Sequence, residues 1–334
     1  MSAIRLGTRA STLATTQSEM VAGLLRSEGL DVNLTTITTH GDTSTASLAA
    51  MGGIGVFASA IRAALLEGEA DIAVHSFKDL PTGRPLGLAI GAVPARADPR
   101  DALVARDGLT LHDLPQEASV GTGSPRRAAQ LLAVRPDLTI VDIRGNVDTR
   151  LGRVKGLGRY AKNGGKEDLD AVVLAAAGLA RLGHSGAVTE FLDPSVVLPA
   201  PAQGALAVEC RTADSRHGKL AKALARIDDR RTRLAATAER AVLSHLEAGC
   251  AAPIGALAQL KPVSGSSPQV LTLDVVVATV DGSRIIREQV SVELPAEVEP
   301  ALAAAHTLGV TAAEELLDDG AADVADLKAS GSTR

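Results

Sequence analysis

Aromatic residues are nearly absent from this chain. Its 334 residues include three Phe, one Tyr and no Trp. Proteins that hold single-stranded nucleic acid by stacking use rows of aromatic side chains, so four aromatic residues exclude that class. Because 46% of the residues are nevertheless apolar, the composition is that of a folded chain and not of a disordered one. Its cores must be built from Ala, Val, Leu and Ile.

Cysteine, long apolar runs and net positive charge are also scarce. Two cysteines, Cys210 and Cys250, cannot form a disulfide framework and indicate a reducing compartment. No stretch approaches the ~18 apolar residues needed to span a bilayer, and the first residues lack the apolar core of a signal peptide. The net charge of −5 argues against a basic protein that binds nucleic acid or membrane surfaces. We therefore expect a soluble, cytoplasmic protein with no nucleic-acid and no membrane partner.

The length predicts two or three domains, at about 150 residues each. In the first part of the chain, short apolar stretches alternate with amphipathic helical ones. The expected strands are 3–6, 32–38, 71–76, 86–93, 102–104, 138–143 and 170–175. The expected helices are one that opens at Ser11, 57–66, 125–134, one that starts at Asn146 and one that ends at Arg181. Such alternation predicts open parallel sheets with helices on both faces.

Two other regions differ in pattern. Residues 152–168 hold five glycines and several charges, which predicts an exposed loop or insertion. From about residue 214 the pattern changes to two helices, 215–225 and 231–246. Two strands, 270–280 and 283–292, then flank Asp281-Gly282, a strong signal for a two-residue hairpin turn. Two Ala-rich helical segments follow. This part predicts a separate α+β unit.

The clearest local pattern is Gly-Thr-Gly-Ser-Pro-Arg-Arg at 121–127. A strand is expected to end in a small-residue turn, and Pro125 suits the first position of a helix. Unpaired backbone N–H groups and the guanidinium groups of Arg126 and Arg127 would make an anion site there. The alternative is an ordinary capped helix with solvated arginines. The Gly-Lys-Ser/Thr ending of a nucleotide-binding P-loop is missing.

Further arginines follow other predicted elements, namely Arg9, Arg144, Arg150 and Arg181. Ligands of open α/β sheets bind beyond the carboxyl ends of the strands. We therefore expect Arg9, Arg126, Arg127 and Arg144 to point into one cleft that binds carboxylates or phosphates. Arginines scattered over the surface are an equally open alternative.

A carboxylate and a cysteine are also candidates for chemistry. Asp79, preceded by Lys78, lies just past an expected strand and could act as an acid or base or stabilise a cation. A plain loop ion pair is the alternative. Cys250 lies in a loop of small residues that leaves room for a covalently attached group. The alternative is a small buried hydrophobic residue, as is common for a single cysteine. Cys210, in an apolar strand, is expected in a core. No cysteine spacing suggests a metal site.

Several longer motifs resemble those of the porphobilinogen deaminase (hydroxymethylbilane synthase) family over nearly the whole chain and in the family's order. They are HSFKDLPT (75–82), DPRDALV (98–104), GTGSPRRAAQL (121–131), RPDLTIVDIRGNVDTRL (135–151), LAAAGLARLG (174–183), LPAPAQGALAVECR (198–211) and AERAVLSHLEAGCAAPIGA (238–256). Ile54 and Ser59 stand where family members commonly have lysines.

The resemblance implies two periplasmic-binding-protein-like (type II) α/β domains with mixed sheets and a smaller C-terminal α+β domain. Domain 1 would comprise residues 1–97 with 203–222, domain 2 residues 98–198, and domain 3 residues 223–334. The chain would return to domain 1 through the strand near 205–210.

The resemblance also implies a transferase of tetrapyrrole (haem-type) biosynthesis. It would join four porphobilinogen molecules into the linear hydroxymethylbilane and release ammonia at each step. One dipyrromethane cofactor would be bound covalently, as a thioether, to Cys250, and Asp79 would be catalytic. The implied cofactor contacts are Ser76, Lys78, Thr122, Ser124, Arg126, Arg127 and Arg144. The implied substrate contacts are Arg9, Ser11, Arg144, Arg150 and Arg181. No metal is implied, and the protein would be a monomer.

Paired α/β lobes alone would also suit a non-catalytic binding protein for an acidic small molecule. Cys250 and the lack of an export signal argue against that class. An anion-sensing regulator is a third possibility, but no DNA-binding element is recognisable.

Overall fold

The computed structural model describes residues 3–37, 56–83, 85–249, 252–261 and 269–325. They form two α/β sheets and one antiparallel sheet. Cys250 and Ile54 lie outside the described residues.

The first sheet has the order β2-β1-β3-β10-β4. Its strands are β1 (Ile4–Thr8), β2 (Val32–Thr36), β3 (Ile72–Ser76), β4 (Leu88–Ala92) and β10 (Leu206–Arg211). Its helices are α1 (Thr12–Ser27), α3 (Val56–Leu66) and α7 (Gly218–Ile227). β1 pairs in parallel with β2 and β3, whereas β10 is antiparallel to β3 and β4. Cys210 is fully buried in β10, as predicted for a core residue.

The second sheet repeats this plan with the order β7-β6-β8-β5-β9. Its strands are β5 (Asp101–Ala105), β6 (Ser119–Gly121), β7 (Thr139–Val141), β8 (Ala171–Ala175) and β9 (Glu190–Phe191). Its helices are α4 (Pro125–Val134), α5 (Val147–Leu151) and α6 (Ala176–Arg181). β6 is parallel to β7 and β8, and β5 is antiparallel to β8 and β9.

The prediction of open parallel sheets is therefore wrong for the fourth strand of each sheet, and the mixed sheets implied by the resemblance are confirmed. β5 and β10 do not follow their neighbours through a helical crossover. Each enters its sheet after the chain has crossed from the other sheet, so the rule that makes β-α-β neighbours parallel does not apply to it.

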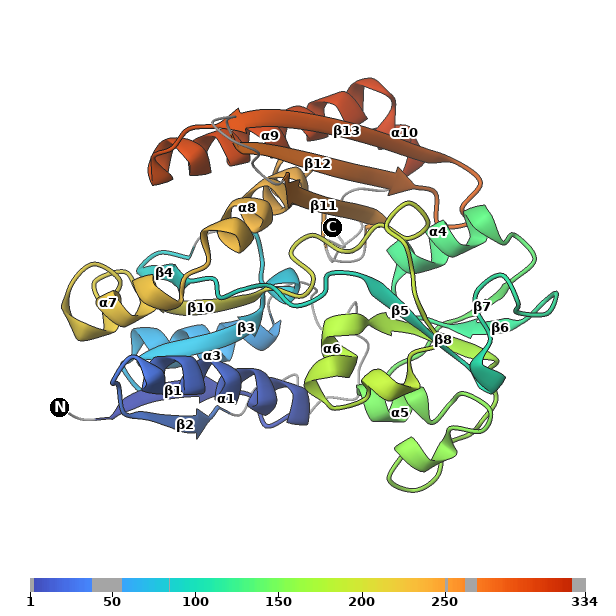
Figure 1. The fold of residues 1–334 in the computed structure, drawn as a ribbon, viewed down its shortest axis with the longest axis horizontal. Coiled ribbons are helices and arrows are strands. Elements are labelled where there is room, and N and C mark those ends of the chain that lie inside the picture. The colour runs from blue at the N-terminus through green and yellow to red at the C-terminus, as the bar shows by residue number, and fades with distance from the viewer. Residues whose placement is uncertain (1–2, 38–55, 84, 250–251, 262–268, 326–334) are drawn as a thin grey trace, which may run out of the picture.

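The two crossing segments, residues 93–100 and 198–205, lie side by side (Figure 1). The backbone N–H of Ala97 donates to the carbonyl of Gly204 at 3.3 Å. A Cβ on Gly204, whose φ is +86°, would lie 2.7 Å from the Ala97 oxygen. Glycine is needed here for both the backbone conformation and the close approach.

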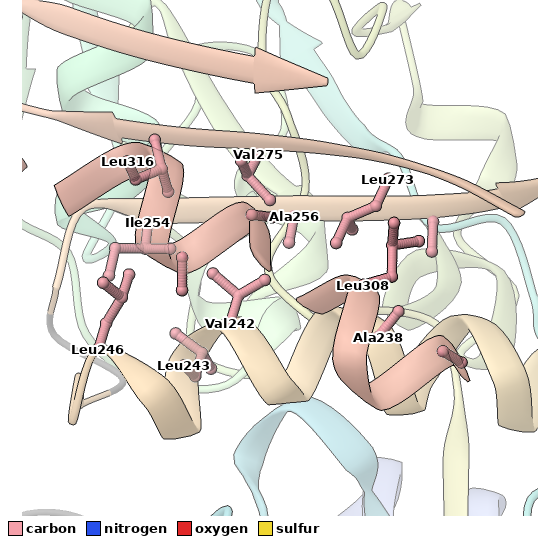
Figure 2. Packing of buried hydrophobic residues seen from close by; sticks show 14 of the residues in the cluster. Ala238, Val242, Leu243, Leu246, Ile254, Ala256, Leu273, Val275, Leu308 and Leu316 are labelled. Atoms are coloured by element: carbon pink, nitrogen blue, oxygen red, sulfur yellow. The ribbon is translucent and has the colours of Figure 1, made fainter. Parts of the chain in front are cut away.

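The third unit begins with α8 (Arg230–His245) and ends with α9 (Val298–Asp318) and α10 (Ala321–Val324). Between them, β11 (Ile254–Leu260), β12 (Gln269–Ala278) and β13 (Ile285–Leu294) form an antiparallel meander. A hairpin joins β12 and β13 around Asp281-Gly282, as predicted. The predicted two-residue turn is wrong, because residues 279–284 connect the two strands. Figure 2 shows the core, in which side chains of α8, α9, β11 and β12 meet in one apolar layer. The separate α+β unit is thus confirmed, but its predicted start near residue 214 is wrong, because α7 packs on the first sheet.

A buried carboxylate of this third unit holds both crossing segments. Glu239 of α8 pairs with Arg96 of the first segment, at 2.6 Å between Oε1 and Nη1. The same side chain accepts hydrogen bonds from the backbone N–H of Ala202, in the second segment, and of Ala258, in β11. Breaking such a buried pair costs about 3–5 kcal/mol, so this contact ties the three units together strongly.

The predicted loop at 152–168 is largely exposed but tightly built. It holds one 3-10 turn, Gly158–Tyr160, and is anchored by the buried Val154. A Cβ on Gly165 would overlap the Gly152 carbonyl oxygen, so two glycines let the loop fold on itself. In the described part of the chain, no helix is long and apolar enough to cross a membrane.

Candidate active site

A cavity of about 150 Å³ lies where the three units meet. Its walls come from the turn after β3, the start of α4, the second crossing segment, α8 and the chain just before β11. The lining residues are Lys78, Asp79, Ser124, Arg126, Arg127, Ala200, Pro201, Gln203, Leu243, Gly249, Ala252 and Ile254.

The start of α4 brings the predicted anion turn to this cavity. The helix spans Pro125–Val134, with Pro125 in its first turn as predicted. Ser124 has the extended backbone of an N-cap, but its side chain makes no capping hydrogen bond to the described backbone, and the residue lines the cavity. The Thr122 hydroxyl accepts from the Ser124 N–H at 3.2 Å and shapes the turn. Gly123 fits because a Cβ would lie 2.7 Å from the Ile143 oxygen.

Arg126 and Arg127 are buried and share one carboxylate, that of Asp101 in β5. The Nη2 atoms of Arg126 and Arg127 lie 2.8 and 2.7 Å from the two Asp101 oxygens. Burial by itself would raise the pKa of Asp101, but the two guanidinium groups outweigh it and hold that pKa well below its usual range. Arg126 also donates to the Leu198 carbonyl at 2.5 Å, and Arg127 to that of Val173 at 3.1 Å.

Asp101 was not among the predicted site residues. It lies inside the DPRDALV motif, so the motif is the signal that could have drawn attention to it. Its role depends on β5 lying next to α4, which is a long-range contact.

Lys78 and Asp79 occupy the short turn Phe77–Asp79 directly after β3. The Lys78 ammonium donates to Gln203 Oε1 at 3.2 Å, and Gln203 Nε2 donates to Asp101 Oδ1 at 2.9 Å. Burial lowers the pKa of Lys78 to about 8, although the nearby Asp79 opposes that change. Three cations, Lys78, Arg126 and Arg127, thus stand against the carboxylates of Asp79 and Asp101, which favours an anionic ligand.

The turn that carries Asp79 is held from the third unit. Arg240 of α8 donates to the carbonyls of Phe77, Leu80 and Pro81 at 3.0, 2.7 and 2.7 Å. Its guanidinium also lies 4.4 Å from the centre of the Phe77 ring. Asp79 itself is exposed, which leaves its carboxylate open to a ligand. Neighbouring Ser76 pairs its hydroxyl with the Gln17 amide at 2.9 Å.

The remaining predicted residues lie outside the cavity lining. Arg144 is 58% exposed and pairs with Asp142 at 3.2 Å. Arg150 donates to the Gly145 carbonyl at 2.9 Å. Burial lowers the pKa of Arg150, and the positive charges of Arg127 and Arg144 lower it further. Arg150 is therefore close enough to both arginines to interact with them electrostatically.

Arg181, Arg9 and Ser11 lie at element ends, as predicted. Arg181 donates to the Gly204 carbonyl at 2.7 Å, its Nε has no partner among the described residues, and burial lowers its pKa. Arg9 is partly exposed beyond β1. Ser11 caps α1, its hydroxyl accepting from the Ala14 N–H at 3.3 Å. Ser59 is exposed on α3.

The predicted attachment residue, Cys250, lies outside the described residues, but Gly249 and Ala252 on either side both line the cavity. Within the described ranges, no group of three His, Cys, Asp or Glu residues could hold a metal ion.

Comparison with known proteins gives a consistent result over the whole chain. Residues 4–219 match the family model described as porphobilinogen deaminase, dipyromethane cofactor binding domain, and residues 233–318 match that of the porphobilinogen deaminase C-terminal domain. A porphobilinogen deaminase of Cutibacterium acnes is 98% identical over 100% of both chains. That of Micrococcus luteus is 52% identical, covering 96% of this chain and 94% of the relative.

Solved structures give weaker matches. Apo YehZ from Escherichia coli is 14% identical with a TM-score of 0.39, covering 68% of this chain and 86% of that one. A periplasmic solute-binding protein from Roseobacter denitrificans with bound glucuronate is 8% identical with a TM-score of 0.35, covering 68% and 78%.

Proposed function

The chain belongs to the porphobilinogen deaminase family, and we propose that it joins four porphobilinogen molecules head to tail into hydroxymethylbilane, releasing ammonia at each condensation. The observation that carries this proposal is the cavity in which Lys78, Arg126 and Arg127 stand beside the open carboxylate of Asp79. Each pyrrole unit of the substrate bears an acetate and a propionate group. A cleft that binds them needs several cations close together.

The residues of the cavity fit a dipyrromethane cofactor, which is acidic and is held at a cysteine. The cations supply partners for its carboxylates, and the chain on both sides of Cys250 lines the same cavity. Cys250 would hold the group as a thioether, with contacts from Lys78, Thr122, Ser124 and Arg126. Further contacts would come from Ser76, Arg127 and Arg144. When bound, a dipyrromethane supplies the end to which pyrrole units are added.

Asp79 is the group that acts on the reacting atoms. Its carboxylate favours the positive charge that develops on the pyrrole ring and its methylene carbon as ammonia leaves, a ring charge absent from the bound substrate. It also accepts and returns the protons that the condensation moves. Its exposure at the end of a turn held by Arg240 allows contact with substrate without loss of position.

Cations outside the cavity wall would bind the incoming substrate. The proposed contacts for pyrrole carboxylates lie at or near the ends of helices and strands; they are Arg9, Ser11, Arg144, Arg150 and Arg181. Arg144, being exposed with one exposed partner, can exchange Asp142 for a substrate carboxylate at little cost.

The same proposal includes the domain arrangement and the setting. Domain 1 comprises 1–97 with the segment from 203, domain 2 comprises 98–198, and domain 3 carries the cysteine loop. We move the end of domain 1 from 222 to 227, because Ala223 and Leu224 of α7 are buried in the core of the first sheet. We further propose that the protein is cytoplasmic and monomeric.

The decisive experiment is the intact mass of the purified protein. Chains made in cells that supply porphobilinogen should exceed the chain mass by one dipyrromethane. Cys250→Ser should lack the excess, whereas Cys210→Ala, the control on β10, should keep it. A folded parent protein at the bare chain mass would overturn the cofactor and favour a non-catalytic binding protein.

A second experiment tests Asp79. Asp79→Asn should lower kcat by about 10²–10⁴-fold, the usual contribution of an acid–base group. Its Tm should not change, because Asp79 is exposed. Asp31→Asn, an exposed aspartate before β2, is the control and should keep full activity. Turnover within tenfold of the parent in Asp79→Asn would remove Asp79 from the mechanism.

A further inference from the structure

The third unit touches α4, the helix that carries Arg126 and Arg127, at the tip of the β12–β13 hairpin (Figure 1). A Cβ on Gly282 would lie 2.5 Å from the Ala129 oxygen and 2.7 Å from the Ala133 nitrogen. The hairpin therefore sits directly on the backbone of α4, and a glycine is required at the contact.

A polar contact lies beside this one. Arg287 of β13 donates from Nη2 to Gln130 Oε1 of α4 at 3.1 Å. The same nitrogen lies 3.4 Å from the Val196 carbonyl oxygen, in the chain that leads to the second crossing segment. Gln130 is 1% exposed, so this contact reaches into the interior.

From Gln130 the hydrogen bonds continue to Arg126. Gln130 Oε1 accepts from the Leu198 N–H at 2.8 Å, and Gln130 Nε2 donates to the Leu198 carbonyl at 3.1 Å. That carbonyl also accepts from Arg126 Nη1 at 2.5 Å. The position of the Leu198 carbonyl thus sets the position of one arm of the Arg126 guanidinium.

These hydrogen bonds form only when the Gln130 amide has its oxygen toward Arg287 and the Leu198 N–H and its nitrogen toward the Leu198 carbonyl. A buried amide can place either its oxygen or its nitrogen at a given contact. The Leu198 N–H requires the amide oxygen at its present place, and the carbonyls of Leu198 and Arg126 require the nitrogen at its own. Arg287, which has only donors, adds a second donor to the oxygen and so reinforces this orientation from β13.

We propose that Arg287 is a positioning residue for Arg126, acting from the third unit through Gln130 and the Leu198 carbonyl. The proposal rests on the proposed function, in which Arg126 binds the carboxylates of an acidic ligand. The domain that carries the cysteine loop would then also fix the position of Arg126, one of the cations that the attached group contacts. The attached group and Arg126 would keep the same relative position.

Arg287→Met tests the proposal, because Met keeps the aliphatic length and removes every donor. The KM for porphobilinogen should rise by about 2- to 12-fold, the range that one hydrogen bond carries, with kcat unchanged. Arg287→Lys keeps a single donor nitrogen, which can still reach Gln130, and should recover part of the loss. Arg284→Met is the matched control on the same hairpin. Its guanidinium makes one hydrogen bond among the described residues, to the Asp319 carbonyl at 3.4 Å, so KM should not change.

A double-mutant cycle separates positioning from plain stability. In a Gln130→Met background the path is already cut, so adding Arg287→Met should change KM by less than twofold. The second readout is the rate at which cofactor-free chain, made without porphobilinogen, gains the dipyrromethane mass when porphobilinogen is added. That rate should fall in Arg287→Met and not in Arg284→Met.

Three results would overturn the inference. The first is that the increases in KM caused by Arg287→Met and Gln130→Met multiply in the double variant. The second is an equal rise in KM for Arg284→Met, and the third is a fall in Tm of Arg287→Met with KM and loading rate unchanged. Failure of the proposed function is distinguishable, because the parent protein itself would then neither turn over porphobilinogen nor gain the cofactor mass.

Discussion

The arginines of the cavity wall, Arg126 and Arg127, and the exposed Arg144 outside the lining, which with Asp142 is called the rim below, carry the same charge in opposite surroundings. Arg126 and Arg127 are 4% and 7% exposed and share the fully buried Asp101. Arg144 is 58% exposed and meets an Asp142 that is 63% exposed. The ion pairs of Arg126 and Arg127 with Asp101 are part of the folded interior, whereas the exposed Arg144–Asp142 pair can open without disturbing the fold.

The difference in burial indicates that the two groups of arginines bind different ligands. Guanidinium groups that are already oriented by a buried carboxylate lose little further freedom on binding, which suits a group that stays bound. An exposed pair costs little to break, which suits substrates that arrive and leave. We infer that the wall binds the cofactor and the substrate unit next to it, whereas the rim first receives incoming porphobilinogen.

Removing the shared carboxylate should have the largest effect on the fold. Asp101→Asn leaves two buried guanidinium groups without their counter-charge and should lower the free energy of unfolding by about 3–5 kcal/mol. The matched change at the rim, Asp142→Asn, should alter it by less than about 1 kcal/mol. Denaturant unfolding of both variants measures the contrast. Equal losses would show that Asp101 is not the buried anchor described here.

The arginines themselves should separate binding from stability. Arg144→Leu should raise the KM for porphobilinogen by about 10- to 150-fold, as expected for one charged hydrogen bond, without a change in Tm. Arg127→Leu should lower Tm, because it removes one of the two arginines that pair with the buried Asp101. It should also slow the rate at which the chain gains the cofactor mass, because the wall loses a cation. If Arg144→Leu lowered Tm, or kept the parent KM, its assignment to the rim would be wrong.

Local signals in the sequence predicted much of this arrangement. Helix α4 spans the predicted residues 125–134, and Ser11 caps α1, because caps and Pro positions depend on neighbours in the chain. Local signals did not predict the antiparallel placement of β5 and β10, since it depends on the chain crossing twice between sheets. Only the family resemblance implied mixed sheets. For the same reason the burial of Arg126 and Arg127 on Asp101 was missed. Charge and spacing predicted that arginines gather, but not which of them are already paired.

Lys78 is the cation of the wall that can lose its charge, and its effect should be the smallest. Its pKa of about 8 in the folded protein is below the value of about 10.4 in an unfolded chain. Between these values the unfolded state binds more protons, so the free energy of unfolding should rise with pH, by at most about 1.4 kcal/mol per pH unit. Below pH 8 both states are protonated, and the cost of burying the ammonium is fully present.

Unfolding measured at pH 7 and pH 9.5 checks this sign. Between these two pH values the free energy of unfolding should rise more for the parent protein than for Lys78→Met, which lacks the titrating group. Over the same range the KM of the parent for its acidic substrate should rise, because the wall loses one positive charge. A parent and variant with parallel pH profiles in both measurements would show that Lys78 stays charged. The wall would then consist of three permanent cations, and its contrast with the rim would rest on burial alone.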